Sequence, residues 1–204
     1  PVPARDRARG RPLGEIARQP ALIVAVLCAM VAYGSMNLVM VSTPLAMVAC
    51  GHPFETAAFV IQWHVVGMFA PSFVTGHIIH RFGALPVIAV GGLLIFACAV
   101  VNLTGIEVLQ FWAALVLLGV GWNFMFIGGT TLLTETYRPE EQSRVQAMNE
   151  FLVFGTTAVT ALASGALFST LGWQAVNLGI LVPVIGATAA ALWLARRRPA
   201  PVAT

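Results

Sequence analysis

Charged residues are scarce in this sequence, and lysine is absent altogether. Only 9% of the 204 residues are charged, whereas 58% are hydrophobic. Average soluble domains carry roughly a quarter charged residues. A water-soluble fold of this size could not cover its surface with so few charges, so we expect lipid to be the solvent around most of the chain.

The patterns typical of metal, nucleotide and nucleic-acid sites are also missing. The cysteines Cys28, Cys50 and Cys98 have no metal or redox spacing, and there is no phosphate loop or dinucleotide fingerprint. His77 and His80 lie one helical turn apart, but two ligands make no closed metal site. No basic stripe with interleaved aromatic residues indicates nucleic-acid binding. We therefore expect no enzyme activity, no metal, no cofactor and no nucleic-acid partner.

Six long apolar segments dominate the chain. A helix needs about 20 apolar residues to cross the roughly 30 Å of hydrocarbon in a bilayer. Backbone groups in lipid must bond internally, so we expect continuous helices rather than irregular chain. The segments run approximately over residues 21–49, 56–79, 85–104, 108–133, 145–169 and 174–195. The sequence thus predicts an all-α integral membrane fold with six transmembrane helices in one bundle.

Arginine placement predicts the orientation of these helices. All 11 basic residues are arginines, and each lies before the first span, in the second-to-third or fourth-to-fifth connector, or after the last span. Cytoplasmic loops are the ones enriched in positive charge, so both termini should be cytoplasmic. We expect a cytoplasmic linker over residues 1–19 with a short interfacial helix, a transmembrane bundle over 20–196, and a cytoplasmic tail over 197–204.

Two of the predicted cytoplasmic connectors carry distinctive motifs. In residues 76–83, Gly76 and Gly83 permit a tight turn with close helix approach, and Arg81 can tie the turn to neighbouring helix ends. In the fourth-to-fifth connector, a proline followed by two glutamates at 139–141 is typical of a helix start. Proline fixes φ in the first turn, and negative charge suits the positive end of the helix dipole.

These motifs resemble those of the major facilitator superfamily. Residues 76–83 resemble its signature loop, with His80 in place of the usual acidic residue, which fits the more degenerate copy after the eighth helix. The connector around 139–141 resembles the loop after the tenth helix. Residues 119–124 and 146–151 resemble parts of helices ten and eleven in a bacterial subgroup. From residue 12 onward, the chain therefore resembles the C-terminal six-helix half of such a transporter.

The resemblance implies a secondary transporter that works by alternating access in the bacterial inner membrane. In that family two six-helix bundles rock about a central site, and this chain would be the second bundle. The implied partners are a small organic solute, the lipid bilayer, the missing N-terminal half, and a coupling proton or ion unless transport is simple facilitation. Two alternatives stay open: a stand-alone homo-oligomeric permease or channel, and a non-transporting membrane module that recruits partners.

Polar groups inside the spans are the candidate solute ligands, because such groups are costly in lipid and transporter sites lie near the midplane. These candidates are Tyr33, Asn37, Gln62, His64, Trp122 and Asn123. His64 is also the candidate proton carrier, since imidazole titrates in the physiological range. The candidates for a cytoplasmic gating loop are Gly76, His80, Arg81, Gly83, Arg144 and Glu150.

Overall fold

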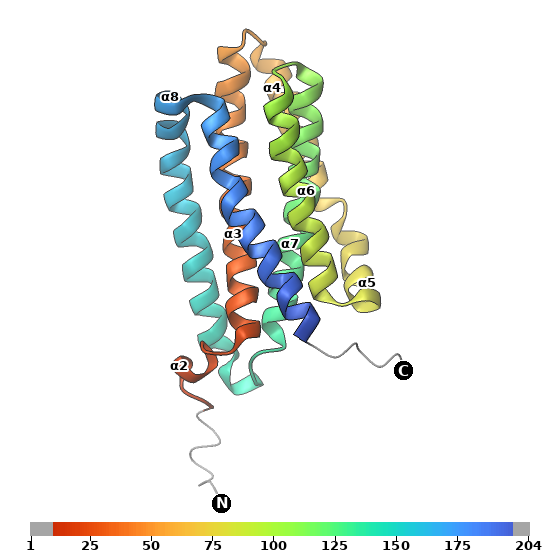
Figure 1. The fold of residues 1–204 in the computed structure, drawn as a ribbon, viewed down its shortest axis with the longest axis vertical. Coiled ribbons are helices and arrows are strands. Elements are labelled where there is room, and N and C mark those ends of the chain that lie inside the picture. Colours follow the sequence, from red (N-terminus) through yellow and green to blue (C-terminus); the bar gives the residue numbers. More distant parts are fainter. Residues whose placement is uncertain (1–9, 198–204) are drawn as a thin grey trace, which may run out of the picture.

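A computed structural model describes residues 10–197, and every regular element in that range is a helix (Figure 1). The elements are α2 (Leu13–Ile16), α3 (Pro20–Ala49), α4 (Phe54–Phe69), α5 (Ser72–Phe82), α6 (Ala84–Thr104), α7 (Val108–Thr134), the 3-10 turn η1 (Pro139–Glu141) and α8 (Gln142–Arg197). Residues 1–9 of the predicted linker and 198–204 of the predicted tail lie outside the described residues. The prediction of an all-helical chain is confirmed for the described part.

Five helical stretches in the described range are long and apolar enough to cross a membrane. They are Pro20–Ala49, Phe54–Phe82, Ala84–Thr104, Val108–Thr134 and Pro139–Arg197. The last stretch has 59 residues. It would be about 90 Å long if straight, roughly three times the hydrocarbon thickness. The chain instead reverses at Gly172, whose φ of 79° and ψ of −178° are not helical and favour glycine. Figure 1 shows the two limbs of α8 on either side of this reversal.

The second predicted span, 56–79, is interrupted near its middle. α4 ends at Phe69 and α5 begins at Ser72, with Ala70 and Pro71 between them. Proline has no N–H and its ring crowds the carbonyl four residues earlier, so the hydrogen-bond ladder breaks there. The whole stretch remains a candidate span, but it is built from two helices rather than the one expected.

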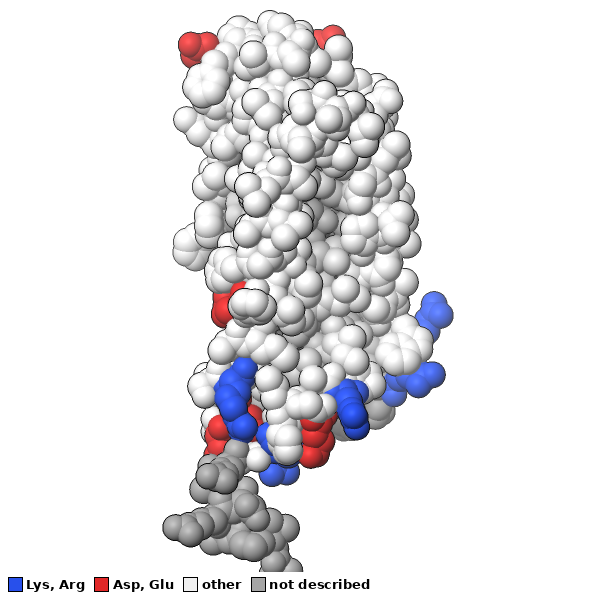
Figure 2. Space-filling model, turned by 90° about the vertical axis from the view of Figure 1, so that its left-hand side faces the viewer, with Lys and Arg blue, Asp and Glu red and all other residues white. Residues whose placement is uncertain are grey.

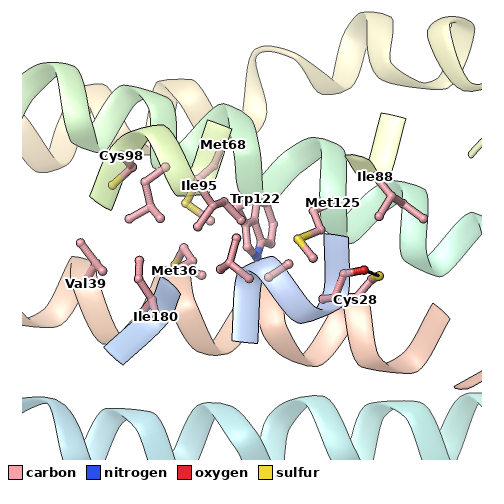
Figure 3. Close-up of a cluster of buried hydrophobic side chains, with 14 of the residues drawn as sticks. Cys28, Met36, Val39, Met68, Ile88, Ile95, Cys98, Trp122, Met125 and Ile180 are labelled. Atoms are coloured by element: carbon pink, nitrogen blue, oxygen red, sulfur yellow. Dashed lines mark hydrogen bonds between the residues drawn. The ribbon is translucent and has the colours of Figure 1, made fainter. Parts of the chain in front are cut away.

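The helix α7 packs against α3, α4 and α6, and glycines allow two of these contacts to be very close. A Cβ at Gly119 would lie 2.5 Å from the His64 carbonyl oxygen on α4. A Cβ at Gly91 on α6 would lie 2.5 Å from the Met125 amide nitrogen on α7. Small residues are what permit such backbone approach between membrane helices. Buried side chains such as Met36, Met125 and Ile180 fill the space between α3, α7 and the last limb of α8 (Figure 3).

Arginines are confined to one end of the bundle on the face drawn in Figure 2. α3 begins and α8 ends at this same end (Figure 1). The long middle of that face is almost free of charge. This separation is the one expected for a chain that crosses a membrane several times, and the cytoplasmic orientation of the arginine-rich end stays a prediction.

Candidate functional site

Five aromatic rings from four helices meet near the middle of the bundle, and we call them the aromatic cluster. They are Tyr33 on α3, Phe69 at the end of α4, Trp122 and Phe126 on α7, and Phe154 on α8. The Tyr33 ring centroid lies 5.0 Å from that of Phe126, 5.3 Å from Trp122 and 6.1 Å from Phe154. Trp122 stacks on Phe126 at 5.2 Å, and Phe69 meets Trp122 edge-on at 6.3 Å. These spacings are those of interacting rings, so the cluster links α4 to α8 across α3 and α7.

The aromatic cluster is buried on one side and open on the other. Trp122 is only 6% exposed and lies among the buried hydrophobic side chains of Figure 3. Phe69 and Phe154, at the two ends of the cluster, are 58% and 55% exposed. The cluster therefore has a packed base on α7 and two end rings that remain more than half exposed.

Two exposed polar side chains share a helix face with these open rings. Gln62 lies two turns before Phe69 on α4, and Glu150 lies one turn before Phe154 on α8. Residues at these spacings point to the same side of a helix. We call the surface formed by Gln62, Glu150 and the aromatic cluster the polar–aromatic face. An amide and a carboxylate at membrane depth are costly against acyl chains, so this face is suited to water, solute or another protein.

Asn123, although adjacent to Trp122 in sequence, makes its contacts at the break between α4 and α5. Its side-chain nitrogen donates to the Met68 carbonyl at 2.6 Å and to the Ser72 hydroxyl at 2.7 Å. Its side-chain oxygen accepts from the Thr75 hydroxyl at 2.6 Å. Asn123 is fully buried, and its amide supplies a donor to the Met68 carbonyl beside the break at Pro71. In this conformation Asn123 clamps the helix break.

Asn37 and His64 are likewise tied to neighbouring helices. The Asn37 side chain donates to the Thr157 carbonyl at 3.1 Å and to the Thr160 hydroxyl at 3.2 Å on α8. His64 is fully buried, with Nδ1 lying 2.8 Å from the Leu115 carbonyl. A carbonyl only accepts, so Nδ1 carries the proton, and Nε2 has no hydrogen-bond partner in the described part of the chain.

The structure thus divides the predicted solute ligands into two groups. Tyr33, Gln62 and Trp122 belong to the polar–aromatic face, whereas Asn37, His64 and Asn123 bond between helices. Their roles toward a solute stay predictions. Sequence reasoning missed the phenylalanines of the cluster, because an apolar ring gives no contrast within an apolar helix.

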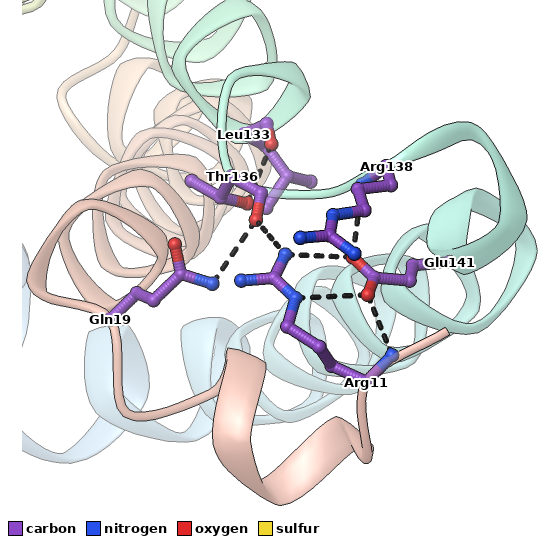
Figure 4. Close-up of polar contacts among 6 residues, drawn as sticks. All are labelled: Arg11, Gln19, Leu133, Thr136, Arg138 and Glu141. Atoms are coloured by element: carbon purple, nitrogen blue, oxygen red, sulfur yellow. Dashed lines mark hydrogen bonds and ion pairs between the residues drawn. The ribbon is translucent and has the colours of Figure 1, made fainter. Parts of the chain in front are cut away.

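At the arginine-rich end, Arg11 and Glu141 form a hydrogen-bonded ion pair that we call the linker latch (Figure 4). One Glu141 oxygen accepts from the Arg11 backbone N–H at 2.7 Å and from Nε at 2.9 Å. The other accepts from Arg11 Nη2 at 2.8 Å and from the Arg138 backbone N–H at 2.9 Å. Arg11 Nη2 and the Gln19 side chain also donate to the Thr136 carbonyl just beyond α7.

The linker latch contains four charge-assisted hydrogen bonds to one carboxylate. Glu141 is fully buried, and its carboxylate is held ionised by four donors. The hydrogen bond to Glu141 raises the pKa of Arg11 above its usual value. The latch fixes residues on the N-terminal side of α3 to the connector between α7 and α8, a link that the sequence did not suggest.

The predicted gating residues other than Glu150 lie at the same end but are arranged differently from expectation, and Glu150 lies about two turns into α8. Gly83 ends α5 with φ 86°, which fits the predicted tight turn. A Cβ at Gly76 would meet nothing within 4 Å among the described residues, so the close approach expected at that glycine is not present. The Arg81 guanidinium lies 5.3 Å from the centroid of the Phe82 ring. The side chains of His80, Arg144 and Glu150 are exposed.

Comparison with known proteins gives a consistent family assignment. Residues 25–204 match the Major Facilitator Superfamily. The riboflavin transporter RfnT of Brucella anthropi is 44% identical over 176 residues, which are 86% of this chain and 44% of that protein. Two uncharacterized MFS-type transporters of Bacillus subtilis, YddS and YdeG, are each 29% identical, over 79% and 74% of this chain and 38% and 37% of their own length.

No solved structure matches the chain. The chain spans less than half the length of the curated relatives it matches. Its sequence match extends over most of its length, and its described part has the apolar helices of a multi-pass membrane protein. The chain belongs to the major facilitator superfamily.

Proposed function

We propose that this chain is one half of a secondary transporter that moves a small organic solute by alternating access. The observation that carries the proposal is the polar–aromatic face. Gln62 and Glu150 are exposed on helices that are apolar enough to cross a membrane, and acyl chains are unfavourable neighbours for both. Transporter sites lie near the midplane, between repeated bundles, so such a face is what one wall of a central pathway requires.

The second wall would come from the missing N-terminal half. One bundle supplies one side of a site between bundles, and the chain covers 44%, 38% and 37% of its relatives. We count the two limbs of α8 on either side of Gly172 as separate spans, and so propose six spans for this half. With an even number of spans and arginines at one end, we place both termini in the cytoplasm and the bundle in the bacterial inner membrane. Residues 1–19 then act as the linker between halves and 197–204 as a tail.

Riboflavin is the first solute to test, because the relative that is 44% identical is described as a riboflavin transporter. The activity we propose is transport without chemical conversion of the solute. Coupling to a proton through His64 is a separate part of the proposal. A His64→Gln variant of the full transporter should lose its response to an imposed pH gradient. A proton dependence equal to that of the unchanged transporter would remove His64 from the mechanism.

Transport in reconstituted vesicles tests the proposal directly. We expect the full-length transporter to take up tritiated riboflavin with saturation, and the 204-residue chain alone to give none. Co-expression with the N-terminal half should restore uptake. Saturable flux through the chain alone would contradict the half-transporter proposal in favour of a homo-oligomeric permease. Absence of flux for riboflavin and for a panel of small organic solutes with the full-length protein would favour a non-transporting module.

A further inference from the structure

We propose that the aromatic cluster binds a planar heteroaromatic ring of the transported solute, with Phe69 and Phe154 as its two open ring contacts. This inference rests on the proposed function, because it places the ring on the face assigned to the central pathway. It goes further by naming the part of the solute that is bound and the side chains that bind it. The predicted ligands Tyr33 and Trp122 become the packed base of this site.

The geometry of the cluster favours a flat, extended partner. Consecutive rings from α4 to α8 are spaced 6.3 Å, 5.3 Å and 6.1 Å apart, through Trp122 and Tyr33. Each of these contacts is edge-on, with interplanar angles of 71°, 79° and 61°, so neighbouring rings present alternating faces and edges rather than one parallel stack. A planar ring system can cover several such rings at once, in the offset or edge-on geometries that aromatic pairs prefer.

The open rings leave more apolar surface uncovered than the packed base does. Phe69 and Phe154 are 58% and 55% exposed, whereas Trp122 is 6% exposed. A phenylalanine side chain can bury 150–250 Å², roughly half of which is therefore still available on each of these two residues. A solute ring that contacts Phe69 and Phe154 would add to the ring contacts already present within the cluster.

Polar groups beside the cluster distinguish a heteroaromatic ring from a lipid tail. Glu150 offers a carboxylate that accepts hydrogen bonds, and Gln62 offers an amide that both donates and accepts. Both are exposed and share the helix faces of Phe154 and Phe69. Ring N–H and carbonyl groups, or hydroxyls attached to the ring, can use these partners, whereas an acyl chain cannot. The combination of stacking surface and flanking polar groups is typical of specific small-molecule sites.

A compact organic cation is the nearest competing ligand, since aromatic rings and a carboxylate also attract positive charge. Cation sites place a charge over ring faces within about 6 Å of the centroids, often as a closed cage. Here the rings contact one another in succession from α4 to α8, and the two end rings are more than half exposed, so no closed cage is present in the described part of the chain. A planar ring therefore fits the cluster better than a compact cation, and the experiment below includes a compact cation as a competing ligand.

The test uses the full-length transporter in vesicles, with tritiated riboflavin as the probe. Lumichrome supplies a planar heteroaromatic ring without the sugar-alcohol chain, ribitol supplies the chain without the ring, and tetramethylammonium supplies a compact cation. We expect lumichrome to inhibit riboflavin uptake competitively and the other two to have no effect. Inhibition by ribitol or tetramethylammonium without inhibition by lumichrome would overturn the assignment to a ring.

Variants of the open rings locate the effect on the cluster. Phe69→Leu and Phe154→Leu should each raise the KM for riboflavin and the inhibition constant of lumichrome about two- to tenfold, as expected for losing one aromatic pair. The maximal rate should change little, and Phe154→Trp, which keeps a ring, should retain low KM. Phe73→Leu and Phe151→Leu are matched controls, because these rings are 94% and 78% exposed and make no described contact with the cluster.

The outcomes separate this inference from the proposed function. Uptake that is saturable but unchanged in KM for both Phe69→Leu and Phe154→Leu would refute the ring site and leave the transporter intact. If the unchanged transporter takes up no riboflavin, the solute in the proposed function fails first. Quenching of lumichrome fluorescence by the purified full-length protein then tests the site. Quenching that is lost in Phe154→Leu supports the inference, and absence of quenching overturns it.

Discussion

Replacing Arg11 by alanine is expected to release the linker from the bundle. The substitution removes the Nε bond of 2.9 Å and the Nη2 bond of 2.8 Å to Glu141, and the 3.2 Å bond to the Thr136 carbonyl. The Glu141 carboxylate keeps two backbone donors, from residues 11 and 138. It therefore becomes a buried anion without its cation, while the backbone of the connector stays in place.

The magnitude follows from the burial of the two partners. Removing one partner of a fully buried ion pair costs about 3–5 kcal/mol, and exposed pairs contribute roughly 0–1 kcal/mol. Glu141 is 0% exposed but Arg11 is 28% exposed, and two donors to the carboxylate remain. We therefore expect about 2–3 kcal/mol, between the values for exposed and for fully buried pairs. Since 1.4 kcal/mol is a factor of ten, the open linker should become about 30–100 times more populated.

Limited proteolysis measures this population. Arg18 is exposed and lies between the latch and the start of α3. The Arg11→Ala variant and the unchanged protein both retain Arg18. Trypsin needs an opened backbone, so cleavage after Arg18 should follow the open population when opening is fast compared with cleavage. The rate, followed by mass spectrometry on the full-length transporter in detergent, should rise about 30–100-fold in Arg11→Ala. Arg11→Lys keeps the charge but loses the bidentate hydrogen-bond geometry. Its cleavage rate after Arg18 should therefore lie between those of the unchanged protein and Arg11→Ala.

The neighbouring acid provides a matched control. Glu140 carries the same charge as Glu141, but its side chain is exposed and takes no part in the described latch. Glu141→Gln should accelerate cleavage after Arg18, and Glu140→Gln should not. Equal cleavage in Arg11→Ala and in the unchanged protein would refute the reasoning. So would equal acceleration by the two glutamate variants, because general charge rather than the latch would then explain the effect.

Three further predictions concern packing and topology. Asn123→Leu removes every bond of the clamp and should lower the free energy of unfolding by about 2–3 kcal/mol, measured by thermal denaturation in detergent. Gly119→Ala places a Cβ against rigid α4 backbone and should cost about 1–3 kcal/mol, whereas Gly76→Ala, with open space around its Cβ, should be tolerated in the same assay. The last prediction uses a background without the native cysteines. There, Trp173→Cys should react with an impermeant thiol reagent only from outside the cell, and Arg18→Cys only from inside. The reverse labelling pattern would overturn the predicted orientation.

The all-helical, apolar character of the chain could be predicted from the sequence because length and apolarity are what a membrane-crossing helix requires. The break at Pro71 could not. Pro44 and Pro183 are also prolines within apolar segments, yet both lie inside continuous helical stretches. What a proline does there depends on which neighbours bond the groups it frees. At Pro71 the neighbour is Asn123, on a helix far along the sequence, and only the folded arrangement brings it to the break.

The candidate functional site could also be predicted from the sequence only in part. Polar residues stand out against apolar helices, so the sequence identified Tyr33 and Trp122, two members of the cluster, through their polar atoms. Phe69 and Phe154 carry no such signal, and the role proposed for them rests on their exposure next to other rings. The linker latch could not be predicted for a different reason. From the sequence alone, Arg11 cannot be distinguished from the other arginines that flank the predicted spans.

The sequence neighbours Trp122 and Asn123 connect the aromatic cluster to the helix break. Both project from α7, which close glycine contacts hold against α4 and α6. Trp122 contacts the Phe69 ring just before the break, while Asn123 bonds the backbone and side chains around it. A shift of α5 relative to α7 that strains the Asn123 bonds therefore acts on the segment that carries Phe69. The proposed alternating access would use contacts of this kind, because a solute changes a conformational equilibrium only through interactions that differ between the two states.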